Sequence, residues 1–112
     1  MKVETVRVDE MFGKEYAGTY AFQEISWGRR NRIIEKYVKY NRQTGEVIAT
    51  DNTSIQAETM WASLKTQPDH KPITLEKLLC EDDNGIPIGL GELFSKTVNR
   101  LNGLSVQETK NC

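Results

Sequence analysis

The chain has 112 residues, with 15 lysines and arginines against 16 aspartates and glutamates, so its formal net charge is −1. A chain of this length is expected to fold as one domain that buries enough apolar surface to need no disulfide or metal. The near balance of charge excludes a domain that is basic as a whole, the kind that nucleic acid or an anionic membrane attracts.

Neither the cysteines nor the opening stretch indicates export. Cys80 and Cys112 follow no CxxC or metal-ligand spacing, and we expect both to be reduced thiols. The stretch MKVETVRV lacks the basic segment and apolar run of a secretory leader, and nowhere do about eighteen apolar residues follow one another. These features predict an unsecreted, cytoplasmic protein that does not enter a membrane.

Two short strands are expected first. Residues 2–8, KVETVRV, are rich in β-branched side chains, and residues 19–25, TYAFQEI, alternate aromatic with smaller residues. The stretch MFGKEYAG between them holds two glycines and shows no periodicity, which favours a turn. The two strands are therefore predicted to pair as a small antiparallel unit.

The strongest helical pattern begins after Ser26, which is a good N-cap residue. Apolar side chains then recur on one face as far as Tyr40, and the turn signal at Thr44-Gly45 ends the pattern. The apolar residues of this face are Trp27, Ile33, Ile34, Tyr37, Val38 and Tyr40.

Three further helices are predicted along the rest of the chain. One follows a cap at Asp51 or Asn52 and covers about 53–66, a short one over 75–80 follows Thr74, and the last runs from Pro87 to Asn102-Gly103. The expected core of mutually buried side chains is Trp27, Ile34, Val38, Met60, Trp61, Leu64, Phe94 and Leu101.

The predicted fold class is thus mainly α with a small N-terminal β unit (α+β). About four short amphipathic helices would pack as an irregular bundle after two antiparallel strands. We expect a single domain over 1–112, with strands in 1–25, a helical body in 26–103 and a flexible polar tail in 104–112.

Charge is segregated along the chain. Residues 26–42 hold six basic residues and one acidic residue, a net charge of +5, which leaves the rest with nine basic and fifteen acidic residues, a net charge of −6. Arg29, Arg32, Lys36 and Lys39 would gather opposite the apolar face, as in a helix that contacts phosphates. No helix-turn-helix partner or zinc motif accompanies them, so a solvated face, or one that meets an acidic patch such as Glu81-Asp82-Asp83, is preferred.

Arg30 falls within the apolar arc of the same predicted helix, between Tyr37 and Ile34. One interpretation is an arginine at the rim whose stem packs on Tyr37, and this is preferred. The other is an anchor for a carboxylate across a helix interface.

The sequence offers no catalytic motif. His70 lies in a Pro-bounded loop and Cys80 follows ten residues later, but nothing places a third group beside them. The stretch EDDNG lacks the ligand spacing of a calcium loop. We therefore predict no enzyme activity, no cofactor and no metal site, and we interpret the apolar stripes as core or as a groove for a partner.

Four stretches follow one another along the chain: FQEISWGRRNRIIEKY, ETMWASLK, ITLEKLL and IPIGLGELFSKTVNRLNGLSVQETKN. Taken in this order, they resemble the tail assembly chaperones of tailed bacteriophages and related proviruses, and the resemblance covers about residues 20–111. The position of Arg29 is often acidic in that pattern, and the strand VETVRV has no match in it. The resemblance implies a small cytoplasmic protein that binds the long tape-measure protein during tail assembly.

A protein partner, the tape-measure protein or another tail protein, is therefore expected, with a homo-oligomer possible. Neither a membrane nor nucleic acid is the expected partner. The alternative function is a small nucleic-acid-binding or regulatory domain that uses the basic helix 26–42. The residues predicted to bind the partner are Trp27, Arg29, Arg30, Arg32, Lys36, Leu90 and Phe94.

Overall fold

The computed structural model describes residues 1–103, and the predicted flexible tail lies outside the described residues. Strands β1 (Val3–Val8) and β2 (Gly18–Gln23) pair antiparallel, as predicted, with Val3 opposite Gln23 and Val8 opposite Gly18. A third strand, β5 (Leu64–Thr66), pairs with the other edge of β2, so the sheet order is β1-β2-β5. Two short 3₁₀ turns, η1 (Glu10–Phe12) and η2 (Lys14–Tyr16), connect β1 to β2.

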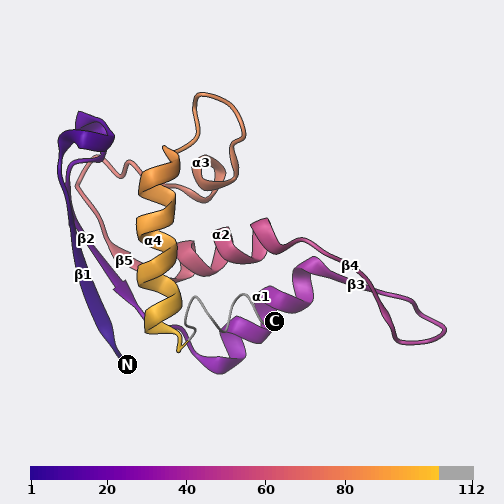
Figure 1. The fold of residues 1–112 in the computed structure, drawn as a ribbon. Helices are drawn as coiled ribbons and strands as arrows, with labels where there is room; N and C mark the ends of the chain where they lie inside the picture. Colours follow the sequence, from indigo (N-terminus) through magenta and orange to yellow (C-terminus); the bar gives the residue numbers. More distant parts are fainter. Residues whose placement is uncertain (104–112) are drawn as a thin grey trace.

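Helix α4 (Ile88–Leu101) covers one face of this sheet (Figure 1). Its Phe94 ring lies between two aromatic side chains of β2, with ring centroids 5.0 Å from Tyr20 and 5.2 Å from Phe22. Leu90, Phe94, Val98 and Leu101 recur at the spacing of a helix face, and all four are buried. The main core therefore lies between α4 and the sheet.

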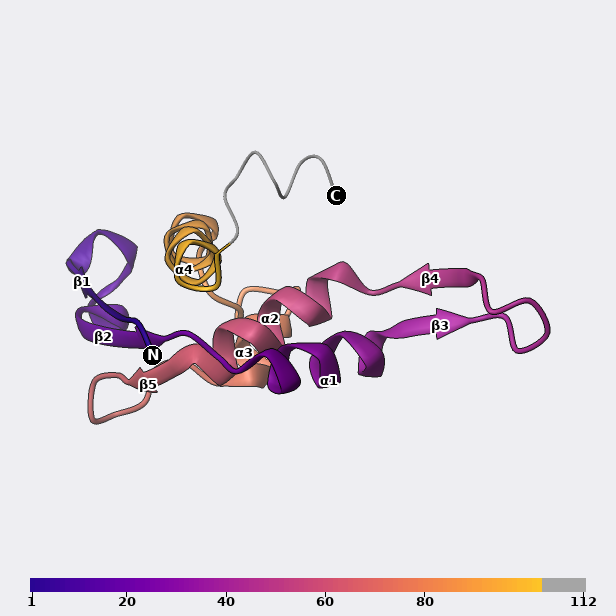
Figure 2. The same cartoon turned by 90° about the horizontal axis from the view of Figure 1, so that it is seen from below.

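The middle of the chain forms a long hairpin that leaves this core (Figures 1 and 2). Helix α1 (Trp27–Tyr37) runs directly into strand β3 (Val38–Tyr40), and strand β4 (Val47–Thr50) returns antiparallel to it and leads into helix α2 (Asn52–Ser63). We call residues 38–50 the arm. The short helix α3 (Leu75–Leu79) packs against α2.

The predicted fold class is wrong, because residues 1–103 form a mixed α/β fold with five strands in two sheets beside four α-helices. The missed strands β3, β4 and β5 have three or four residues each. Strands of this length add too few residues to show alternation, and two of them directly continue a helix. The helix expected over 26–42 therefore ends at Tyr37, and the one expected over 53–66 ends at Ser63.

The predicted starts of three helices are confirmed by their caps. Ser26 accepts a hydrogen bond from the backbone N–H of Arg29, and Asp51 and Thr74 cap α2 and α3 through the same contact three residues on. The last helix ends at Leu101 as expected, and Gly103 follows it with φ at +79°.

The predicted core is only partly right. Met60, Phe94 and Leu101 are buried, but Trp27 is 80% exposed and Trp61 lies at the surface. The reason is that α1 packs against α2 and not against the sheet, so that Ile33 is its one buried residue. The sheet and η2, not α1, supply the other side of the core, chiefly through Val8, Tyr20 and Phe22 of the strands and Tyr16 of η2.

The arm makes the molecule elongated. The principal extents of the molecule are 51 × 33 × 25 Å, and its radius of gyration is 15.1 Å. A compact domain of this length has a radius of gyration of about 13 Å. The excess reflects the hairpin, which projects from the body formed by α4 and the sheet (Figure 2).

Among residues 1–103, no helix combines the length and the apolar character that crossing a bilayer requires.

Candidate protein-binding surface

The arm carries apolar side chains that no other part of the described fold covers. Tyr40, Val47 and Ile48 are each more than half exposed, and every residue of β4 is exposed. An isolated two-stranded ribbon is marginally stable in water, and it is usually supported by a third strand or a packed helix. In residues 1–103, β3 and β4 form a sheet of only two strands. The arm therefore presents an unpartnered apolar ribbon.

The exposed side of α1, the helix that leads into the arm, carries positive charge along its length. Arg29 and Arg32 are exposed, and the one acidic contact of Arg32 is Glu35 on the same helix at 3.8 Å. Exposed pairs of this kind contribute little stability, so both guanidinium groups remain accessible to a partner. Lys39 continues the positive charge onto β3, where it is exposed as well.

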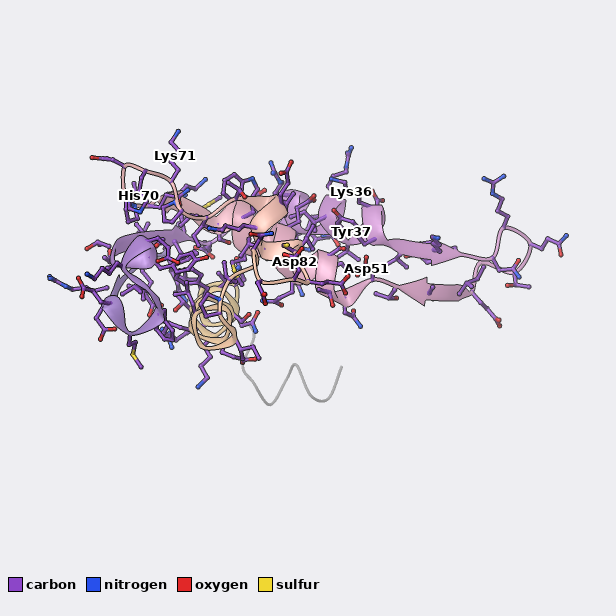
Figure 3. The ribbon with its side chains drawn as sticks, turned by 90° about the horizontal axis from the view of Figure 1, so that it is seen from above. Lys36, Tyr37, Asp51, His70, Lys71 and Asp82 are labelled. Carbon is purple, nitrogen blue, oxygen red and sulfur yellow. The ribbon has the colours of Figure 1, made fainter. Side chains whose placement is uncertain are left out.

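Lys36 has a structural role at the root of the arm. Its Nζ donates to Oε1 of Glu58 on α2 at 2.7 Å, and the hydroxyl of Tyr37 donates to the same oxygen at 3.0 Å. The Glu58 side chain is only 10% exposed, and the Lys36 hydrogen bond holds its pKa below the usual range. The same hydrogen bond raises the pKa of Lys36. This contact joins the end of α1 that leads into the arm, where Figure 3 labels Lys36 and Tyr37, to the middle of α2.

Asp51 secures the opposite side of the same root. Its carboxylate accepts from both the backbone N–H and the hydroxyl of Ser54, and the hydroxyl hydrogen bond is the main reason for its lowered pKa. The backbone N–H of Asp51 donates to the carbonyl of Tyr37 at 3.0 Å. This hydrogen bond links the junction of β4 with α2 to the junction of α1 with β3. The arm is thus fixed at its base and free along its length.

Two of the predicted partner-binding residues are not surface residues. Leu90 and Phe94 are each 0% exposed and belong to the core between α4 and the sheet. An apolar stripe on an amphipathic helix predicts that this face of the helix is covered. The stripe does not tell whether the protein's own core or a partner protein covers it. Here the sheet covers it, so these two residues are removed from the candidate surface.

The remaining predicted residues lie along α1, at its start and middle. Trp27 occupies the first helical position, and Arg30 is half-buried. In the part of the chain that the structure describes, no carboxylate forms an ion pair with Arg30. The contacts therefore supply no anchor across the helix interface for this guanidinium.

His70 and Cys80, the two reactive side chains considered in the sequence, contact different parts of the structure. Nε2 of His70 lies 2.6 Å from the carbonyl oxygen of Glu15, at the end of the molecule away from the arm (Figure 3). The thiol of Cys80 donates to Asp82 at 2.9 Å, and that hydrogen bond raises its pKa, which lowers the thiolate fraction. Residues 1–103 contain no group of three or more His, Cys, Asp or Glu side chains suited to hold a metal.

A groove of about 600 Å³ lies on the side of α2 that faces α3 and the start of α4. Most of its lining is apolar, from Ala57 and Met60 of α2, Leu78 of α3, and Ile86 and Pro87 before α4. Ile88, at its edge, is 84% exposed. Sequence periodicity did not indicate this groove, because its walls come from three separate elements.

No protein-family model, curated protein or solved structure matches this chain.

The arm is the feature that the sequence prediction missed. The stretch YVKY before the Thr44-Gly45 turn and the stretch VIAT after it contain β-branched or aromatic residues on either side of a turn signal. Those features are typical of a hairpin. They were hidden because Tyr37, Val38 and Tyr40 also continue the helical period that starts at Trp27.

Proposed function

We propose that this protein is a non-enzymatic tail assembly chaperone of a tailed phage or provirus, which binds the tape-measure protein in the host cytoplasm. The proposal depends on the resemblance carried by the sequence from about residue 20. The observation that supports it best is the projecting arm, whose apolar side chains Tyr40, Val47 and Ile48 are exposed beside the basic side of α1.

The chemistry of this surface defines the partner segment. Apolar side chains along a ribbon suit the apolar face of an amphipathic segment, and flanking arginines suit carboxylates next to that face. The partner segment that fits is therefore amphipathic and acidic. Apolar contacts would supply most of the affinity, while Arg29, Arg32 and Lys39 would set orientation and the rate of association.

The test is co-expression of the candidate tape-measure protein with this chain, followed by pull-down at low and high salt. An arm variant, Tyr40→Ser with Ile48→Ser, is expected to lose most recovery of the partner. A charge variant, Arg29→Glu with Arg32→Glu and Lys39→Glu, is expected to bind less and to lose its dependence on salt. Lys36 is left unchanged because it supports the buried Glu58.

Met11→Ser serves as the matched control. Met11 is also apolar and highly exposed, but it lies on η1, at the end of the molecule away from the arm (Figure 1). Circular dichroism establishes that each variant is folded. Equal recovery by the folded arm variant and the wild type would exclude the arm, and failure of the wild type to recover the tape-measure protein would exclude that partner.

The alternative, binding of nucleic acid by the basic helix, has less support. Of the four basic residues expected in one helical row, Lys36 is paired with Glu58 and Lys39 lies on β3. Two exposed arginines remain on the helix itself. We expect duplex DNA to bind no tighter than about 10⁻⁴ to 10⁻⁶ M at physiological salt, the range of non-specific binding, and a much tighter, sequence-dependent complex would favour the alternative.

A further inference from the structure

A small pocket lies at the root of the arm, where α1 passes into β3 and β4 leads into α2. Its volume is about 280 Å³. Pockets that hold whole small molecules occupy about 300 to 1,000 Å³, so this one suits a single side chain of a partner. We call it the root pocket. Residues from both connections of the arm line it: Lys36, Tyr37, Lys39, Ala49, Thr50 and Asp51.

The two carboxylates at the root already have hydrogen-bond donors. Asp51 accepts from the backbone N–H and the hydroxyl of Ser54, at 3.0 and 2.6 Å. Glu58 accepts from Nζ of Lys36 and from the hydroxyl of Tyr37. Both negative charges are therefore paired within the fold, and neither requires a cation from a partner.

The two ammonium groups of the root pocket keep unused donors. An ammonium group has three N–H donors and no acceptor. Nζ of Lys36 donates to Glu58, and the Lys36 side chain is 58% exposed. Lys39 is exposed as well, and within residues 1–103 it takes part in no ion pair. The group that suits the root pocket is therefore an anion that accepts hydrogen bonds.

The rest of the root pocket is apolar and leads onto the arm. Nζ of Lys36 lies 5.5 Å from the centre of the Tyr37 ring, so the cation and the ring are neighbours in the pocket. Lys39 is directly opposite Ala49 in the strand register, and residues directly opposite each other share a face of a sheet. A short acidic side chain can therefore place its methylene groups on Tyr37 and Ala49 and its charge at the lysines.

We infer that the root pocket binds one acidic side chain of the partner segment, a glutamate or an aspartate, whose carboxylate pairs with Lys39 and with the remaining N–H donors of Lys36. The inference rests on the proposed function, because the apolar side chains of the arm hold the rest of the same segment. It adds the residue that fixes the position of the segment along the arm. A charge-assisted hydrogen bond at one end of the arm sets this register, while apolar contacts farther along supply affinity.

The first test selects peptides without using the tape-measure protein. An mRNA-displayed library of random peptides, whose C-termini are blocked by the linker, is selected on the purified full chain. Peptides that also bind the arm variant, Tyr40→Ser with Ile48→Ser, are discarded. The wild type should select peptides that place an acidic residue at a constant spacing from apolar residues.

Two lysine variants show whether the root pocket makes this selection. Lys39→Met keeps a long side chain without the charge, and it should select the apolar residues without the acid. Lys65→Met is the matched control, because Lys65 is an exposed strand lysine on β5, away from the arm. It should select the same peptides as the wild type.

Measured affinities then test the pairing itself. Replacing the acidic residue of a selected peptide with its amide should weaken binding to the wild type about 10-fold, as expected for the loss of a hydrogen bond between charged groups. The same replacement should change binding to Lys39→Met much less, and this double-mutant cycle isolates the contact between the two side chains. Lys39 is exposed, so Lys39→Met should remain folded, and circular dichroism checks this.

Three results would overturn the inference. One is an equal loss of affinity with Lys39→Met and with the wild type when the acid is replaced by its amide. Another is a set of arm-dependent peptides without an acidic residue at a fixed position, and the third is a wild type that selects no arm-dependent peptide.

Co-expression with the tape-measure protein separates the inference from the proposed function. If the wild type and Lys39→Met bound the tape-measure protein with equal affinity at low and high salt, the proposed function would stand and the inference would be wrong. If acidic peptides bound as described but no tape-measure protein were recovered, the inference would stand for another acidic partner and the proposed function would not.

Discussion

Replacing Phe94 with alanine tests whether α4 belongs to the core and not to a partner surface. Phe94 is 0% exposed and lies between the rings of Tyr20 and Phe22. Truncation of a buried phenylalanine costs about 3 to 5 kcal/mol, and each aromatic pair contributes about 0.5 to 1.5 kcal/mol beyond its buried area. Because two pairs are lost here, we expect a loss of about 4 to 5 kcal/mol in the free energy of unfolding.

The assay is urea unfolding followed by far-ultraviolet circular dichroism. Tryptophan fluorescence is a poor reporter of this core, since Trp27 and Trp61 both lie at the surface. With a urea dependence of about 2 kcal/mol per M, the expected loss moves the midpoint by about 2 M. Ile88→Ala on the same helix is the matched control, and its effect should stay within about 0.5 kcal/mol. If both variants had the same midpoint as the wild type, α4 would not pack on the sheet as described.

Two further predictions concern the root of the arm and the start of β2. The folded-state pKa of Glu58 is lowered from 4.5, so its contribution to stability is complete above about pH 5 and is lost as pH falls through that lowered pKa. Glu58→Gln should therefore make the unfolding free energy less dependent on pH below about 5, and an unchanged dependence in urea titrations at several pH values would contradict this. Gly18 has φ at +143°, and a Cβ there would lie 2.6 Å from Cγ of Pro68. Gly18→Ala should cost more than about 1 kcal/mol in thermal unfolding, whereas Gly28→Ala, where the added Cβ meets open space, should not.

The sequence was informative where one physical signal acts alone. Ser26, Asp51 and Thr74 mark helix starts because their side chains accept backbone hydrogen bonds that the helix leaves unpaired. The pairing of the first two strands followed from residue types that suit a pleated surface. Both predictions needed only neighbours in the chain.

The sequence was misleading where the same pattern of apolar residues fits two different structures. Val38 and Tyr40 fit the helical period from Trp27 and also the alternation of a strand, and only the pairing of Lys39 with Ala49 decides between them. Phe94 belongs to an apolar stripe that would suit a partner equally well, and the sheet that covers it comes from residues far away in the chain. Trp27 is a residue type typical of a core, but it is 80% exposed at the first position of α1. Each outcome was set by long-range packing.

The central claim is that the arm and the adjoining side of α1 bind a protein partner, and hydrogen exchange measured by mass spectrometry tests it most directly. The protein is compared alone and in complex with the co-expressed tape-measure protein. We predict slower exchange of backbone amides in residues 27–50, strongest in the arm, because a partner would cover a ribbon that is otherwise exposed on both faces. A stable complex in which exchange of the arm is unchanged would contradict the account.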